Sequence, residues 1–506
     1  MRQAVCYRSI EAMIGTWIQQ LTDSNVYEQA FKTIDNHLRR DDGPSSELDY
    51  VEQTSWVLFL KYLHDLEAER ADEAALSGRP YARILHGDFA WDAWAMPRDE
   101  DGRLDRDALR TGDDLIVFVE RRLFPQLAGF RATATGPDTI EYKIGEIFTE
   151  LRNRFRSGFA LRDVIEVVDA LDFGTQAQRH ELSELYEQRI KRMGNAGRNG
   201  GEYYTPRAII RAMLQVVDPK IGETIYDGAC GSAGFLCEAF DHLNTGSLSG
   251  SEWETLQRRT LYGQEKKTLP YVIGVMNMIL HGVEAPNIRH ANTLTENVMD
   301  ISEDDRHDVV LANPPFGGDE RAEVQHNFPI QTGETAYLFV QHFIRKLKPG
   351  GRAAIVIKNT FLTNGDATAL RREVLDRCDL HTVLDLPAKA FLGAGVKTVV
   401  LFLTKGAPTR STWYYQLDPG RSLGKTNPLN DADLAEFVEM QRTRAEGPRS
   451  WIVRRGDLDE ATLDLGVRNP HAPEAEAERE PAEIIDAMLA RDAETAEILR
   501  GLRAML

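Results

Sequence analysis

In the N-terminal part of the chain, apolar residues recur three to five positions apart, as they do along one face of a helix. Residues 50–69, YVEQTSWVLFLKYLHDLEAE, carry acidic residues on the opposite side, which predicts an amphipathic helix. Similar patterns occur at 114–123, 140–154 and 178–193, whereas strand-like alternation is scarce before residue 220. We therefore predict a helical N-terminal domain over residues 1–190.

The pattern changes after residue 220, where short apolar runs alternate with segments of helical length. The runs are TIYDGA, TLYGQE, HDVVLANPP, GRAAIVIK, HTVLDLP and KTVVLFLT. This alternation predicts a mostly parallel sheet with helices on both faces. We expect an α/β, Rossmann-like domain over residues 191–410. It begins with the glycine- and asparagine-rich run MGNAGRNGGEYY, which is typical of a flexible connection.

The alternation is lost from about residue 407, so we expect residues 411–506 to form a C-terminal extension. Its last part places apolar residues at helical spacing: Ile484, Ile485, Met488, Leu489, Ile498, Leu499, Leu502 and Leu506. The spacing predicts a helical C-terminal tail. Such a helix either packs on its own domain or docks on a partner, and composition alone favours packing.

Composition narrows the class of protein. The chain has 506 residues, 42% of them hydrophobic and 27% charged, which is typical of a globular protein with two or three domains. Its apolar runs are far shorter than the ~20 residues of a membrane helix, and its N-terminus lacks a signal-peptide pattern. We therefore expect a cytoplasmic protein without a membrane segment. Four cysteines without a CxxC pair or a nearby histidine predict neither disulfides nor a metal site.

The formal net charge of −19 bears on any nucleic-acid substrate. A protein that grips DNA alone normally carries a net basic surface. If DNA is the substrate, we expect a partner to supply much of the grip.

The run IYDGACGSAGFL, at 225–236, predicts a strand that ends at Asp227, then a glycine-rich turn and a helix. Glycines let the backbone approach a ligand closely, and the helix N-terminus presents N–H groups. Neither the Walker pattern nor the GxGxxG spacing is present, and the Asp227 carboxylate would repel a pyrophosphate. The same carboxylate would attract the cationic amino-acid end of S-adenosylmethionine. Taken alone, the run also fits a purely structural turn.

A second carboxylate, Glu265, ends the next predicted strand, RTLYGQE. In Rossmann-like sheets an acid at this position accepts hydrogen bonds from ribose hydroxyls. Glu265 follows Asp227 by 38 residues rather than the ~20 of dinucleotide-binding sites, so the connection must hold an insertion. The alternative is a solvated glutamate beside Lys266 and Lys267, and only its combination with the glycine loop favours a cofactor site.

The run DVVLANPPFGG ends a further predicted strand with Asn313, Pro314, Pro315 and Phe316. Because parallel strands end at one rim of a sheet, we expect these residues to face the cofactor. Two prolines hold a rigid, extended turn, while Asn313 and the adjacent backbone offer hydrogen-bond acceptors and Phe316 offers a ring face. These groups suit the exocyclic amine of a base that has been rotated out of a duplex.

The motif order resembles the modification (M) subunit of type I restriction-modification systems, an N6-adenine DNA methyltransferase of the gamma motif order. GEYYTPRAI precedes the glycine loop, NPPF follows it, and further matching blocks lie at 336–362, 370–387 and 395–406. The resemblance covers residues 180–406 strongly. It implies an S-adenosylmethionine-dependent methyltransferase fold for the α/β domain and an adenine site at NPPF.

The resemblance also implies which residues contact S-adenosylmethionine. They are Glu202, Tyr203, Tyr204, Thr205, Pro206, Arg207, Asp227, Ser232, Ala233, Gly234, Glu265, Asn292 and Thr293. Two positions depart from the family's pattern. Gly228 stands where proline is frequent, which makes the loop locally looser without removing a chemical group. Asn292 stands where aspartate is frequent, and the lost carboxylate would weaken cofactor binding.

As an M subunit, the chain is expected to methylate adenine N6 in site-specific double-stranded DNA, with neither a metal nor a covalent enzyme intermediate. The resemblance implies a specificity (S) subunit that reads the sequence, a restriction (R) subunit for cleavage, and a second copy of the M subunit bound to the same S subunit. The terminal helix would dock on the S subunit. Two alternatives stay open: methylation of another amine, such as protein glutamine or RNA guanine, and a catalytically silent scaffold of a defence complex.

Overall fold

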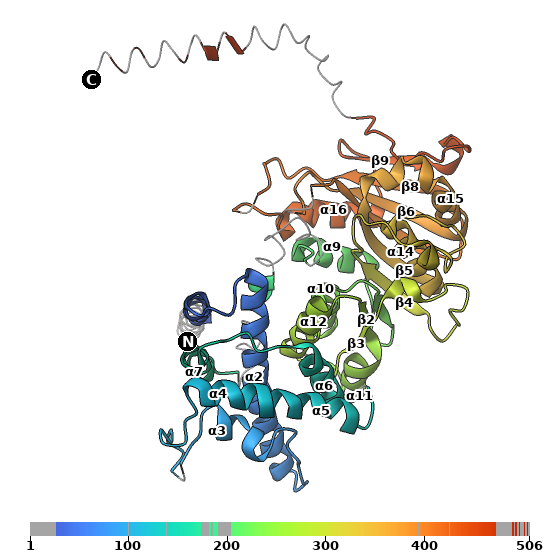
Figure 1. The fold of residues 1–506 in the computed structure, drawn as a ribbon. Helices are drawn as coiled ribbons and strands as arrows, with labels where there is room; N and C mark the ends of the chain where they lie inside the picture. Colours follow the sequence, from blue (N-terminus) through green and yellow to red (C-terminus); the bar gives the residue numbers. More distant parts are fainter. Residues whose placement is uncertain are drawn as a thin grey trace, which may run out of the picture.

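The computed structural model describes residues 27–471 except 100, 138, 174–181, 184–185, 191–203, 392–394 and 425, together with single positions between 488 and 503. A helical part lies beside a sheet that is covered by helices (Figure 1). Glu202, Tyr203 and almost all of the predicted C-terminal helix lie outside the described residues. No described helix is long and apolar enough to cross a membrane.

The helical part comprises the described residues before 174, and one central helix organises it. Its helices are residues 27–40, α2 (Glu47–Leu76), α3 (Trp91–Trp94), α4 (Gly112–Phe118), α5 (Phe124–Thr133), α6 (Ile140–Glu150) and α7 (Gly158–Asp169), with a π-helical turn at Val119–Leu123 between α4 and α5. Residues 182–183 and 186–190 are also helical.

The expectation that α2 is amphipathic is wrong for its middle. Every residue from Gln53 to Leu63 is buried, because α3, α7 and the helix at 268–280 pack against α2. The buried amide of Gln53 is satisfied there. Its Nε2 donates to the carbonyl of Arg152 at 3.0 Å, and its Oε1 accepts the N–H of Arg154 at 3.0 Å.

The sheet has nine strands in the order β3-β2-β1-β4-β5-β7-β6-β8-β9. They are β1 (Ile225–Asp227), β2 (Leu261–Glu265), β3 (Asn287–His290), β4 (His307–Ala312), β5 (Leu347–Lys358), β6 (Cys378–Asp385), β7 (Thr398–Lys405), β8 (Ser411–Gln416) and β9 (Ser450–Arg454). Strands β1 to β6 and β8 run in one direction, whereas β7 and β9 are antiparallel to their neighbours. The order reverses between β1 and β4, as in Rossmann-like folds.

Helices cover both faces of the sheet, which confirms the predicted architecture (Figure 1). They are α9 (Arg207–Val217), α10 (Gly234–Leu243), α11 (Gly250–Thr255), α12 (Thr268–Leu280), α13 (Ala322–Gln325), α14 (Thr335–Lys346), α15 (Thr368–Arg377) and α16 (Asp431–Thr443). In β4, Val309 and Leu311 belong to the core that contains α9, α10 and α12, while Val310 and Ala312 belong to the core of α14 and α15.

The helical part joins the sheet through α12 and β3. Lys143 of α6 donates to the carbonyl of Ile288 at 3.1 Å, and the Tyr271 hydroxyl donates to Glu146 at 2.5 Å. Apolar side chains of α2, α6 and α12 belong to one continuous core. The two parts therefore share a packed interface.

The sheet continues past residue 410, where we expected the C-terminal extension to begin. β8 joins it through parallel pairing with β6, β9 pairs with β8, and α16 packs against α9. The expected loss of strand order was wrong because β8 offers only three consecutive apolar residues, Trp413 to Tyr415, between polar ones. Trp413 and Tyr415 enter one core and Tyr414 enters the other, so no apolar–polar alternation marks the strand.

Candidate active site

Three polar side chains end neighbouring strands at one rim of the sheet. Asp227 ends β1, Glu265 ends β2, and Asn313 directly follows β4. Because β2, β1 and β4 are adjacent and parallel, their carboxyl ends lie together where the strand order reverses. The structure thus places these three predicted site residues at one rim.

The turn between β1 and α10 is tightly built. Gly231 and Ala233 have φ angles of 51° and 63°, in the left-handed region. A Cβ atom on Gly234 would lie 1.6 Å from Nη1 of Arg207, so only glycine fits beside this guanidinium. The hydroxyl of Thr293 donates to the carbonyl of Gly228 at 2.5 Å. Thr293 therefore fixes the backbone at Gly228.

Asp227 is almost fully buried beneath this turn, with 1% of its surface exposed. Its Oδ1 accepts the N–H of Ala229 at 3.0 Å, and its Oδ2 has no hydrogen-bond partner among the described residues. Burial raises the pKa of Asp227 to about 8; the Ala229 N–H opposes this rise, and the charge of Glu265 adds to it. A cationic donor at Oδ2 would pair the orphaned acceptor and stabilise the charged carboxylate.

Glu265 faces the glycine turn rather than solvent alone. Its Oε2 accepts the N–H of Gly231 at 2.9 Å, and its Oε1 accepts the N–H of Lys267 at 2.7 Å. Burial raises the pKa of Glu265, and these N–H groups oppose the rise. Each carboxylate oxygen retains further acceptor capacity, so Glu265 can also receive hydroxyl donors.

Asn313 is 8% exposed, and only one of the two polar atoms of its side-chain amide forms a hydrogen bond. Its Nδ2 donates to Oγ1 of Thr205 at 3.0 Å, while its buried Oδ1 has no partner within the described chain. This arrangement leaves a neutral acceptor at the rim, ready for an N–H donor. An unpaired buried acceptor is costly, so a ligand that fills it gains affinity.

Phe316, two residues after Pro314, is half-buried and packs edge-to-face on Phe391. The ring centroids are 5.2 Å apart and the planes meet at 82°. No sequence motif marks Phe391, which lies 75 positions downstream in the loop between β6 and β7. The only signal in the sequence is an aromatic residue in the run AKAFLG, and its contact with Phe316 is apparent only from the structure.

One narrow cavity connects the glycine turn with the NPPF turn. Ten residues line it: Thr205, Arg207, Asp227, Ala229, Cys230, Gly231, Ser232, Gly234, Phe235 and Asn313. The free space at its centre is about 10 Å³, room for about one water molecule. Its walls must therefore separate to admit a ligand the size of a nucleoside.

Arg207 lines this cavity, but its guanidinium is already engaged. Its Nε and Nη2 donate to the two carboxylate oxygens of Glu187, and its charge centre lies 5.4 Å from the ring centre of Tyr204. Burial acts to lower the pKa of Arg207, but the neighbouring Glu187 outweighs burial and raises it. Burial raises the pKa of Glu187, and Arg207 outweighs that effect and lowers it. The pair is therefore ionised, and it ties the helix at 186–190 to the start of α9.

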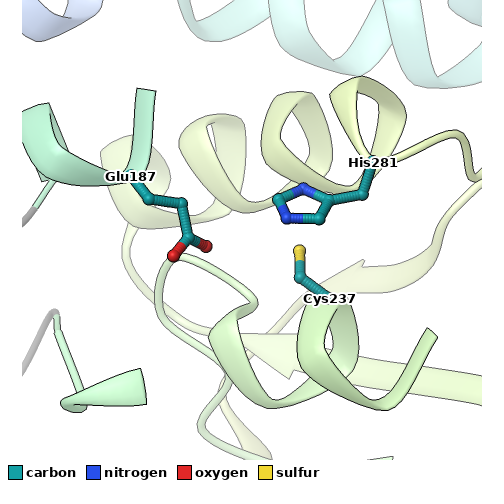
Figure 2. Close-up of side chains that lie close together, drawn as sticks. All are labelled: Glu187, Cys237 and His281. Atoms are coloured by element: carbon teal, nitrogen blue, oxygen red, sulfur yellow. The ribbon is translucent and has the colours of Figure 1, made fainter. Parts of the chain in front are cut away.

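Glu187 also lies close to Cys237 of α10 and His281 at the end of α12 (Figure 2). One ligand atom of each falls within 4.8 Å of the others, which is close enough to consider a metal. The donors are committed elsewhere, however. Arg207 holds both oxygens of Glu187, Nδ1 of His281 lies 2.8 Å from the Asn277 carbonyl, and burial raises the pKa of the Cys237 thiol well above its usual value. This set suits an ion pair with Arg207 better than a cation.

The other predicted cofactor-binding residues occupy defined positions in the fold. Pro206 precedes α9, whose first residue is Arg207, and Ser232 and Ala233 are buried in the glycine turn. Asn292 accepts the N–H of Leu294 at 3.2 Å and caps a short 3-10 turn at Thr293–Thr295. Whether these residues touch a cofactor stays a prediction.

Comparison with known proteins connects this site to one family. A family model described as N-6 DNA Methylase matches residues 177–479. The type I restriction enzyme EcoEI methylase subunit of Escherichia coli is 34% identical over 490 residues, covering 94% of this chain and 96% of that protein.

Solved structures agree with the sequence comparison. The modification subunit of a putative type I restriction enzyme from Vibrio vulnificus YJ016 is 33% identical, has a TM-score of 0.78 and covers 89% of this chain and 97% of its own. A chain from a type I R-M system, solved for its complex assembly and conformational transition, is 34% identical with a TM-score of 0.75, covering 95% of this chain and 98% of its own.

Proposed function

The chain belongs to the N-6 DNA methylase family as a type I restriction-modification methylase subunit, and from this premise we propose which residues carry out its reaction. It is an adenine-specific DNA methyltransferase. The observation that carries the proposal is the cavity that Asp227 and Asn313 line together, in which each side chain presents an orphaned buried oxygen.

We propose S-adenosylmethionine as the methyl donor. Its cationic amino group fits Oδ2 of Asp227, and its ribose hydroxyls fit the carboxylate of Glu265, which caps the glycine turn. When bound, this cofactor supplies a methyl group that is already activated as an electrophile. The protein's task is therefore to position the acceptor amine and to exclude water. The wider set of contacts inferred from GEYYTPRAI, Asn292 and Thr293 stays a prediction.

We propose that the NPPF turn holds the adenine amine. Oδ1 of Asn313 accepts one N6 hydrogen, and a backbone carbonyl of Asn313 or Pro314 accepts the second. The nitrogen lone pair of adenine is delocalised into the ring, and acceptors for both hydrogens favour the pyramidal form in which the lone pair is available. Thr205 keeps the asparagine amide oriented, because it takes the hydrogen bond from Nδ2.

The adenine ring needs a surface once it has left the duplex. Phe316 offers a ring face, and Phe391 of the β6–β7 loop packs against this ring nearly at right angles. We propose that the base stacks on Phe316 and that Phe391 keeps this ring from rotating. Phe391 thus extends the predicted adenine site by one residue.

We propose the partners that the family suggests. A separate specificity subunit would read the DNA sequence, a restriction subunit would add cleavage, and two copies of this chain would join one specificity subunit. The net charge of −19 supports this division of labour, because the chain alone is poorly suited to grip a polyanion. Docking of the C-terminal helix on the specificity subunit, the domain boundary at residue 190 and a cytoplasmic location stay predictions.

The alternatives raised by the sequence lose support. Membership of the N-6 DNA methylase family favours DNA adenine over protein glutamine or RNA guanine. Asp227, Glu265 and NPPF are all present and lie at one rim of the sheet. A scaffold protein without catalytic activity would not require these residues.

Methyl transfer by the chain reconstituted with its specificity subunit tests the proposal. With a labelled methyl donor and duplex DNA, nucleoside mass spectrometry should detect N6-methyladenine. Asn313→Ala should lower the turnover number by about 10²–10³, the typical cost of losing one group that stabilises the transition state, and should spare cofactor affinity. Asn287→Ala, at the amino end of β3 on the opposite rim, is the matched control. Wild-type turnover by Asn313→Ala would contradict the assignment.

A further inference from the structure

A second cleft lies on the same rim as the candidate active site. Its volume is about 520 Å³, and the ends of β5, β6 and β8 contribute Asn359, Asp385 and Gln416 to its wall. β5 is the direct neighbour of β4, which leads into Asn313. The cleft and the candidate active site are therefore neighbours along one edge of the sheet.

The wall of this cleft is rich in hydrogen-bond donors. Trp451 is 4% exposed, and its Nε1 has no partner within the described chain. Lys397 and Arg468 add two positive charges against a single acid in the wall, Asp385. Lys397 neutralises this acid, since its Nζ lies 2.7 Å from Oδ2. Such a wall fits a ligand with negatively charged acceptors.

Packing keeps the indole of Trp451 in place. Its ring stacks on Tyr414, with centroids 5.4 Å apart and planes at 12°. The Tyr414 hydroxyl donates to the carbonyl of Leu465 at 2.9 Å, which anchors the stack. A buried N–H that is fixed without an acceptor is unfavourable, so an acceptor on a ligand would stabilise it.

One loop connects the cleft with the candidate adenine site. It leaves β6 at Asp385, which lines the cleft, and it carries Phe391, which packs on Phe316. It reaches β7 through Lys397, which lines the cleft again. A ligand that occupies both sites would therefore lie across a single loop.

We propose that this cleft binds a phosphodiester of the DNA strand that carries the target adenine, with Trp451, Lys397 and Arg468 as donors. The inference rests on the proposed methyl transfer to DNA. A strand that delivers a base to Phe316 carries its neighbouring phosphates along the same rim. The net charge of −19 disfavours binding of the DNA backbone, and this local group of donors offers one place where a phosphate can bind.

The test measures DNA binding by the chain reconstituted with its specificity subunit, using a labelled duplex that contains the recognised site. Arg468→Ala should lower the slope of log affinity against log salt by about 0.9 for each copy of the chain whose cleft holds a phosphate, the contribution of one phosphate contact. Between roughly 50 and 200 mM salt, the variant should lose less affinity than the wild type loses, by about 3.5-fold for one contact and about 12-fold for two. Arg410→Ala, an exposed arginine beside the start of β8 on the opposite rim, should keep the wild-type slope.

Duplexes with one neutral methylphosphonate locate the contact. At one position near the target adenine, the modification should weaken wild-type binding and have no further effect on Arg468→Ala. Trp451→Phe keeps a stacked ring without the N–H, and it should lower affinity about tenfold at an unchanged salt slope.

An unchanged salt slope for Arg468→Ala, or an equal methylphosphonate penalty in wild type and variant, would overturn the proposal. Binding is measured without turnover. A complex that binds DNA but does not methylate adenine would contradict the proposed function and would leave the test of the cleft intact.

Discussion

The affinity for S-adenosylmethionine should rise about eightfold between pH 6 and pH 7, because Asp227 must lose a proton before it can hold a cation. In the free protein, burial raises the pKa of Asp227 to about 8, so about 90% of these carboxyl groups are protonated at pH 7. The amino group of the ligand, with an ordinary pKa of about 7.7–8.0, stays mostly charged below pH 7. One pH unit therefore raises the ionised fraction of Asp227 from about 1% to about 9%.

Isothermal titration calorimetry of the purified chain, in buffers with different ionisation enthalpies, measures both the affinity and the protons released. At pH 7 we expect a net release of about 0.8 proton per cofactor bound, because Asp227 releases about 0.9 and the amino group of the ligand takes up about 0.1. Asp227→Asn has no carboxyl group to ionise, so it should bind at least about tenfold more weakly and lose the pH dependence. A wild-type affinity that is flat between pH 6 and pH 7, without proton release, would refute the coupling between Asp227 and the cofactor.

Three further predictions concern protein stability and DNA binding. Asp227→Asn should raise the free energy of unfolding of the cofactor-free chain by about 4 kcal/mol at pH 7. The carboxyl has a pKa of about 8 in the folded chain and an ordinary pKa of 3.8. Between these two values it destabilises the folded chain by about 1.4 kcal/mol for each pH unit, and asparagine lacks this effect. Urea unfolding should show a smaller gain at pH 5, and an equal gain would contradict this cause. Phe391→Ala should raise the KM for DNA about threefold to tenfold in steady-state kinetics, since it removes the ring that supports Phe316, and a changed cofactor affinity would argue against this role. Glu187→Gln should lower the free energy of unfolding by about 3 kcal/mol, because it removes the carboxylate that both arms of the buried Arg207 bind and leaves only Glu238, whose Oε1 lies 3.9 Å from Nε; unchanged stability would show that the ion pair is dispensable.

The sequence predicted the parts of the fold that local patterns encode. Asp227 and Glu265 each end a short apolar run before a helical segment, and NPPF breaks a third run. The carboxyl ends of parallel strands meet at one rim, so their convergence follows from strand order alone. The helices on both faces follow from the alternation of strand and helix.

The remaining features depend on contacts between residues far apart in the chain. Phe391 meets Phe316 only because β6 and β7 are placed beyond β5, and no local pattern marks it. Arg207 was expected to face a cofactor, but Glu187 engages its guanidinium from another helix. β8 was missed because its apolar run is only Trp413 to Tyr415, whereas β7, which is also buried on both faces, was predicted from a longer apolar run.

Mapping adenine methylation in cells tests the central claim most directly. The chain is expressed with its specificity subunit in a host without adenine methylation, and the DNA is sequenced for modified bases. We predict N6-methyladenine at a single recognition sequence, and its loss when Asn313 is replaced by alanine. Unmodified adenine with the wild-type chain, or full methylation with Asn313→Ala, would contradict the account.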